Sequence, residues 1–219
     1  DSLLTTTRSI EANYRLGEIR YRILGDLDGA ARHFEDIINN NRNTKLVKES
    51  IFRLVDVRIA KGDLKGAQDV LTEYKSDHHL KKFQSNIAYK QAQVYFYQGE
   101  LDTLVNHLKN ELNSLPLGDE QFNDILEIRS MLANFQQSPE WFAPFAGVQL
   151  LLQQNKREEA LDKLKPFLES SDPPLMELTQ YQVAYLLVLQ GDIPLALEIT
   201  DLISGESMYT ELTIILKAE

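Results

Sequence analysis

Five short turns of one type recur along this sequence of 219 residues, and they constrain its fold more than any other feature. Each begins with Gly or Asn, and four of the five continue with an acidic residue. The five turns read GDLDGA at 25–30, GDLKGA at 62–67, GELDTL at 99–104, NKREEA at 155–160 and GDIPLA at 191–196. Self-similarity at a period of 20–50 residues is typical of proteins built from stacked repeats. We therefore expect a repeat architecture.

Each turn has the chemistry of a junction between two helices. A Gly or Asn after an apolar helical stretch supplies the left-handed residue that ends a helix. The acidic residue after it can cap the next helix, and the small Ala five residues after the Gly lets the two helices approach closely. No alternation of period two persists, so the sequence predicts an all-α chain. The expected helices are 7–24, 27–40, 45–61, 64–76, 80–98, 101–113, 119–136, 139–154, 157–169, 174–190, 193–204 and 207–218.

The first unit resembles the tetratricopeptide repeat family. Tyr14 and Tyr21 stand at the two aromatic positions of that family's first helix, and Ala30, Phe34 and Ile37 at the apolar positions of its second. The resemblance implies an α-α superhelix and a single tetratricopeptide-like domain over residues 1–219. The later units are looser and are similar to those of bacterial cell-envelope assembly factors. That similarity implies an envelope or periplasmic location, with the cytoplasm as the alternative.

The spacing of the turns predicts how the units are grouped. The turns are 37, 37, 56 and 36 residues apart, so one interval holds about one additional helix. We expect three repeats in 1–113, an extra helix or hinge at 119–136, two repeats in 139–206 and a terminal capping helix at 207–219. The extra helix could separate two sub-stacks that touch, which we favour, or kink one continuous superhelix.

In this family the first helix of each unit lines a concave groove, and the resemblance implies that aromatic side chains there bind the partner. Aromatic residues offer large contact areas at low entropic cost. The alternative is that these side chains pack between units. The predicted partner-binding residues are Tyr89, Phe96, Tyr97, Phe142, Phe145, Tyr181 and Tyr185.

Charge narrows the class of partner. The formal net charge is −10, and the excess of acidic residues lies beyond residue 80. Nucleic-acid affinity comes largely from Lys and Arg that neutralise phosphates, so we expect no nucleic-acid binding. We expect instead a protein or peptide that carries basic residues around an apolar anchor. The longest apolar run, Val183–Leu189, is far shorter than the ~20 residues that a membrane-spanning helix needs.

Signals for catalysis are weak. Cysteine is absent, which excludes thiol chemistry and Cys-ligated zinc. The run Asp77–His79 lacks the further ligands of a metal site, so an ordinary loop is the better interpretation. We expect no enzyme activity, cofactor or metal. The favoured function is a scaffold or adaptor that binds a protein segment in its groove. The alternative is a structural or self-associating module that sets spacing in a larger complex.

Overall fold

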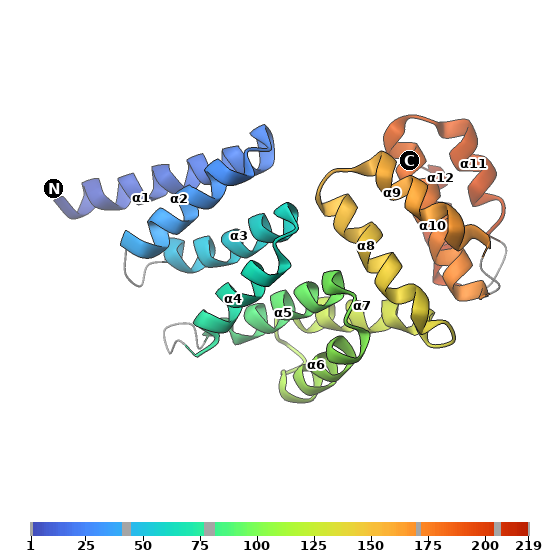
Figure 1. Ribbon diagram of the computed structural model, residues 1–219, viewed down its shortest axis with the longest axis horizontal. Helices are drawn as coiled ribbons and strands as arrows, with labels where there is room; N and C mark the ends of the chain where they lie inside the picture. The colour runs from blue at the N-terminus through green and yellow to red at the C-terminus, as the bar shows by residue number, and fades with distance from the viewer. Residues whose placement is uncertain (1, 41–44, 77–81, 170–171, 204–206, 219) are drawn as a thin grey trace. The chain divides into compact units, whose positions relative to one another are not determined.

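The computed structural model describes residues 2–40, 45–76, 82–169, 172–203 and 207–218, and every regular element in these ranges is a helix (Figure 1). The all-helical prediction is therefore confirmed. The α-helices are α1 (Ser2–Ile19), α2 (Leu27–Asn40), α3 (Lys45–Lys61), α4 (Leu64–Lys75), α5 (Gln84–Gln98), α6 (Leu101–Ser114), α7 (Phe122–Leu132), α8 (Phe142–Gln153), α9 (Arg157–Leu164), α10 (Pro173–Gln190), α11 (Ile193–Thr200) and α12 (Met208–Ala218). A π-helical segment, η1 (Arg20–Leu24), extends α1, and short 3-10 segments occur at η3 (Ala133–Phe135), η4 (Pro139–Trp141) and η5 (Lys165–Glu169).

Most predicted helix ranges agree with the structure to within a few residues. The first helix begins at Ser2 rather than residue 7, and α11 ends at Thr200 rather than residue 204. The Thr200 hydroxyl donates to the Leu197 carbonyl, which also accepts from the Asp201 N–H at the end of the helix. The predicted extra helix 119–136 is shorter: α7 ends at Leu132, and η3 follows it. The run Asp77–His79 lies outside the described residues.

The chain divides into two compact units, Asp1–Glu127 and Ile128–Glu219. In unit 1, α1, α3 and α5 contact one another in order and form a first-helix layer, while α2, α4 and α6 pack on it as the second helices of each pair. In unit 2, α8 pairs with α9 and α10 with α11, and α10 also contacts α12. Among the described helices, none has both the length and the apolar content that a membrane span requires.

All five turns begin with a residue in the left-handed backbone conformation. Their first residues have positive φ, from 58° at Asn155 to 83° at Gly191. In the second turn the Gly62 N–H donates to the Ile59 carbonyl and the Asp63 N–H to the Arg58 carbonyl. The same pair of bonds closes the turns at Gly99, Asn155 and Gly191. This is the Schellman arrangement, which satisfies the last carbonyls of the first helix and reverses the chain.

The first turn differs by one residue. Because η1 is π-helical, the Asp26 N–H reaches back six residues to the Arg20 carbonyl, where the other turns reach back five. The first helix thus holds one more residue before its turn than the corresponding helices of later repeats. Single-turn π segments of this kind absorb an insertion without breaking the helix.

Three aspartates cap the helices that follow the turns. Asp26, Asp63 and Asp192 accept from backbone N–H groups three residues later, at 2.8, 2.9 and 3.4 Å. The bond from Gly29 N–H and then the Arg20 guanidinium lower the pKa of the Asp26 carboxyl from its usual value. Glu100, at the same position in the third repeat, makes no such side-chain bond, so the predicted capping role is wrong there. Its longer side chain does not fit the short capping geometry that Asp satisfies.

The small residues permit close helix contacts, as predicted. Ala30, Ala67 and Ala160 have no exposed surface, and Ala196 keeps 2%. In the first pair Gly17 has the same role, since a Cβ built there would lie 2.8 Å from the Phe34 ring. These residues set the spacing between the two layers.

We predict that replacing Ala67 by Leu lowers the stability of unit 1 by about 1–3 kcal/mol, because the added atoms overpack a contact with no free space. Chemical denaturation followed by circular dichroism measures the change. Ala143, which is exposed on α8, is the matched control. Equal stability of Ala67→Leu and Ala143→Leu would contradict the packing described here.

A second prediction concerns the caps. Asp63→Ala should cost about 1 kcal/mol because the Gly66 N–H loses its acceptor, whereas Glu100→Ala should stay within about 0.5 kcal/mol. Asp63→Asn, which keeps an accepting oxygen, should recover most of the loss. Urea unfolding of the three variants gives the comparison. An equal loss in the Asp63→Ala and Glu100→Ala variants would show that the cap adds nothing.

Candidate functional site

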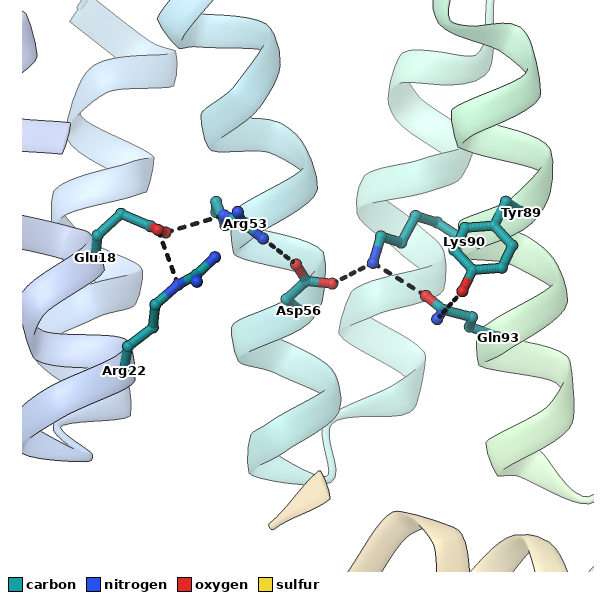
Figure 2. A network of polar contacts seen from close by, with 7 residues as sticks. All are labelled: Glu18, Arg22, Arg53, Asp56, Tyr89, Lys90 and Gln93. Atoms are coloured by element: carbon teal, nitrogen blue, oxygen red, sulfur yellow. Dashed lines mark hydrogen bonds and ion pairs between the residues drawn. The ribbon is translucent and has the colours of Figure 1, made fainter. Parts of the chain in front are cut away.

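A network of polar contacts crosses the first-helix layer of unit 1 from α1 through α3 to α5 (Figure 2). It joins charged and amide side chains from three successive repeats. Its members are Glu18, Arg22, Arg53, Asp56, Tyr89, Lys90 and Gln93. In the family that the sequence resembles, first helices line the groove, so this network lies in the layer for which a binding surface is predicted.

Glu18 on α1 is the carboxylate that joins the first two repeats through ion pairs. Its two carboxylate oxygens lie 2.9 Å from Nε of Arg22 and 2.9 Å from Nε of Arg53. Arg53 also donates a hydrogen bond to the Tyr14 hydroxyl, which opposes the rise in the pKa of Tyr14 that burial causes. The Glu18 side chain keeps 18% of its exposure and that of Arg53 31%, so water screens this pair only partly.

Asp56 on α3 is the acceptor between the second and third repeats. Arg53 Nη1 lies 3.0 Å from one of its oxygens, and Lys90 Nζ on α5 donates to the other. Lys90 Nζ also donates to Gln93 Oε1 at 3.0 Å, and Gln93 Nε2 donates to the Tyr89 hydroxyl at 3.0 Å. Each cation therefore links two acceptors.

The network follows the repeat register. Counting nine residues back from the turn residue gives Arg53 and Lys90, and counting six back gives Asp56 and Gln93. In the first repeat, which is one residue longer at η1, the equivalent residues are Arg15 and Glu18. Arg53 and Lys90 each contact the carboxylate or amide oxygen of their own repeat and the carboxylate of the preceding one, whereas Arg15 pairs with Glu11. The result is a ladder of contacts that fastens neighbouring repeats.

In unit 2 an uncharged contact joins two neighbouring first helices at the equivalent positions. Gln149 stands six residues before the turn at Asn155, and Gln182 nine residues before the turn at Gly191. Gln149 Nε2 donates to Gln182 Oε1 at 2.8 Å. An amide pair thus replaces the ion pair at the equivalent contact between α8 and α10.

A cavity of about 360 Å³ opens beside this amide pair. Tyr181, Tyr185 and Leu189, which lie on successive turns of α10, form much of its wall. Its lining is aromatic, aliphatic and amide, with one charged residue, Arg157. The full lining is Gln149, Leu152, Asn155, Arg157, Tyr181, Gln182, Tyr185, Leu186 and Leu189. The volume lies in the range of sites that bind a single side chain or a small ligand.

Two of the seven predicted partner-binding residues, Tyr181 and Tyr185, line this cavity. Tyr185 is 44% exposed. Tyr181 also lies near Tyr209 of α12, with the two ring centres 6.2 Å apart, so α12 covers part of α10 and leaves the cavity open. Tyr89 and Tyr97 are partly buried in unit 1. Burial is the largest cause of the raised pKa of Tyr89, and the negative charges of Asp124 and Glu127 raise this pKa further.

The other three predicted residues are core side chains, and their predicted surface position is wrong. Phe142 and Phe145 are each 1% exposed and Phe96 is 8% exposed. Phe135 of η3 covers the start of α8, with its ring centre 5.4 Å from that of Phe142 and 5.1 Å from that of Phe145. The segment after α7 thus fills the place where the sequence predicted an open groove.

No motif in the sequence predicted the group formed by Glu18, Arg53, Asp56 and Lys90. The signal was present as a cation and an acceptor at nearly fixed sequence separations before each of the first three turns. In the first repeat this pattern is shifted by one position, because η1 holds an extra residue before the turn. No cluster of three or more Asp, Glu and His side chains able to hold a metal ion occurs in the part of the chain that the structure describes.

We predict that Arg53→Ala lowers the stability of unit 1 by about 1–3 kcal/mol, because it leaves two partly buried carboxylates without their shared cation. Arg15 is the matched control: it holds the equivalent position, but it pairs with Glu11 on its own helix at 3.7 Å, and both side chains are largely exposed. Arg15→Ala should therefore cost less than about 1 kcal/mol. Thermal and urea unfolding measure both. Equal losses would mean that the ladder does not stabilise the stack.

The comparisons with known proteins agree with this architecture. Residues 11–44 match the family model described as tetratricopeptide repeat. This segment runs from within α1 through η1 and α2, and it includes the close contact between Gly17 and Phe34. No curated protein and no solved structure matches the chain. Residues 11–44 are thus similar to a tetratricopeptide repeat, and helix pairs joined by equivalent turns recur along the rest of the described chain.

Proposed function

We propose that the protein is a non-enzymatic scaffold that binds a peptide or protein segment in the cavity between α8 and α10. Tetratricopeptide repeats generally mediate protein–protein interactions and are generally not enzymes. The observation that carries the proposal is the open cavity of about 360 Å³ walled by Tyr181, Tyr185 and Leu189. It provides an apolar wall and hydrogen-bonding amides at its side, the combination that fixes an inserted side chain.

The chemistry of the lining favours binding over catalysis. Among the residues that line the cavity there is one charged side chain, Arg157, and no carboxylate or imidazole. A general acid and base would need two titratable groups within reach of one reacting atom. Tyr185 and Leu189 lose exposed apolar surface when a ligand side chain enters, and each Å² removed from water contributes about 25 cal/mol.

The proposed partner carries an apolar anchor flanked by basic residues. Unit 2 has six Lys and Arg against thirteen Asp and Glu. Near the cavity mouth the charges of Lys156 and Arg157 are offset by Glu158 and Glu159. The negative charge of the whole unit then governs long-range attraction and favours a basic segment. Tyr89 and Tyr97 of unit 1 are proposed as additional contacts, because both keep part of their surface exposed.

A phage-displayed peptide library selected on the intact protein supplies a probe, and fluorescence anisotropy then measures the affinity of the selected peptide. Tyr185→Ala should weaken binding by about tenfold or more, because an exposed aromatic anchor is lost. Raising the salt concentration should slow association of a basic peptide. Tyr181→Ala plus Tyr185→Ala should lose more, with circular dichroism as the check on folding, since Tyr181 also lies near Tyr209.

Arg15→Ala plus Arg22→Ala is the control, because these arginines are exposed and each pairs with an acidic residue on its own helix. It should change affinity by less than about threefold. A larger loss in this control than in Tyr185→Ala, with both variants folded, would place binding on α1 and reject the cavity as the site.

A further inference from the structure

We propose that His33 makes the first repeat sensitive to pH: its neutral ring joins α2 to the end of the first helix, and protonation of the ring breaks the contact with Arg20 and weakens this helix pair. All the residues concerned belong to unit 1. None of them lines the cavity beside α10, so this pH dependence is independent of the proposed peptide site.

His33 lies on α2 at the place where the first two helices approach closely. A Cβ built on Gly17 of α1 would lie 3.3 Å from Cβ of His33 and 2.8 Å from the ring of Phe34. The partly buried ring of His33 contacts the first helix on both sides of this point. Its Nε2 lies 3.1 Å from Nε of Arg20, and its Nδ1 is hydrogen-bonded to Oδ1 of Asn13.

The groups at the two ends of this chain of hydrogen bonds determine the protonation state of the ring. A guanidinium only donates, so Nε2 of His33 accepts from Arg20 and carries no hydrogen. At the other end, Nδ2 of Asn13 donates to the carboxylate of Asp36 at 2.7 Å, which leaves Oδ1 of Asn13 as an acceptor. Nδ1 of His33 therefore donates to it. The network requires a neutral imidazole with its hydrogen on Nδ1.

Protonation of the ring would place a second hydrogen on Nε2, opposite the Nε–H of Arg20. Two donors and two positive charges would then face each other across 3.1 Å. Arg20 is held in place, because its guanidinium also pairs with Asp26 and its backbone carbonyl accepts from the N–H groups of Gly25 and Asp26. The repulsion therefore acts on the residue whose carbonyl closes the first turn.

The charges around His33 favour the neutral ring. Burial is the largest cause of the lowered pKa of His33, and the positive charge of Arg20 is the next. Arg32 lowers this pKa as well, whereas Asp36 and Asp26 raise it. On α3, which packs against α2, the nearby cations are bound by carboxylates of α2, in the pairs Arg58–Glu35 and Lys61–Asp28.

The lowered pKa of His33 sets the sign of the pH dependence. In the unfolded chain the ring takes up its proton near the ordinary pKa of 6.5, whereas in the folded chain it does so only at lower pH. The stability that this contact contributes is therefore complete above about pH 6.5, and it is lost as the pH falls from there through the lowered pKa. At pH 5.5 the unfolding equilibrium constant rises by up to about tenfold.

A second histidine occupies the equivalent position in the third repeat but has different partners. His33 and His107 both stand eight residues after their turn residue. Nε2 of His107 lies 2.8 Å from the carbonyl oxygen of Ala88, which only accepts, so this nitrogen carries the hydrogen. Nδ1 faces the carboxylate of Glu111 at 4.0 Å, and a proton added there leaves the bond to Ala88 intact. His107 is therefore the matched control.

Nuclear magnetic resonance of the histidine ring nitrogens in the intact, isotope-labelled protein tests the geometry directly. His33 should carry its hydrogen on Nδ1 at pH 8 and titrate with a midpoint below 6.5. Arg20→Gln should raise this midpoint, because it removes the opposing charge and supplies an oxygen that can accept. A hydrogen on Nε2 at pH 8, a midpoint at or above 6.5 in the native protein, or an unchanged midpoint in Arg20→Gln would overturn the proposal.

Urea unfolding at pH 7.5 and at pH 5.5 tests the effect on stability. The urea midpoint of the native protein should fall on acidification, and that of His33→Gln should fall less, because the amide makes similar hydrogen bonds and does not titrate. His107→Gln should follow the native protein. Hydrogen-exchange protection should decrease in α1 and α2 but not in α10. Equal falls for the native protein and His33→Gln, or acid-induced loss of protection that spares α1 and α2, would refute the role of His33.

Discussion

The two hydrogen bonds that close four of the five turns around a left-handed residue are the constraint on which the rest of this structure depends. They end the first helix of each pair, reverse the chain and fix the point from which the second helix begins. The same bonds recur in the turns at Gly62, Gly99, Asn155 and Gly191. Residues at the same sequence separation from their turn therefore occupy equivalent positions in successive repeats. Side-chain contacts between neighbouring repeats can then recur at these equivalent positions.

The ladder across the first-helix layer shows that different side-chain pairs can form the contact at these equivalent positions. One geometric step, from the ninth residue before a turn to the sixth residue before the preceding turn, is an ion pair between Lys90 and Asp56 but an amide pair between Gln182 and Gln149. The ion pair joins α5 to α3 at a place where both side chains are partly buried and therefore partly shielded from water. The neutral form places two amide side chains, and no ion pair, beside the cavity between α8 and α10.

Much of the fold could be predicted because it depends on single residues with strong local preferences. A Gly at positive φ and an Asp at a helix start act over four residues, so the turns and most helix ends were visible in the sequence. The cavity was partly predictable, because Tyr181 and Tyr185 hold groove positions of a regular repeat. The burial of Phe142 and Phe145 could not be predicted, because the segment around Phe135 that covers them lies outside the repeat pattern. The ladder was missed because its first step is offset by one residue.

That offset has a consequence for how a chain of this kind can change in length. An extra residue in a regular α-helix rotates everything before it by about 100°, which would carry Glu18 away from Arg53. The wider turn of η1 takes up the residue locally, and Glu18 keeps the place that Asp56 holds one repeat later. Insertions can therefore accumulate just before a turn while the contacts between repeats stay in phase. Alignment by turns and by ladder positions, rather than by a fixed period, is the appropriate way to superimpose such repeats.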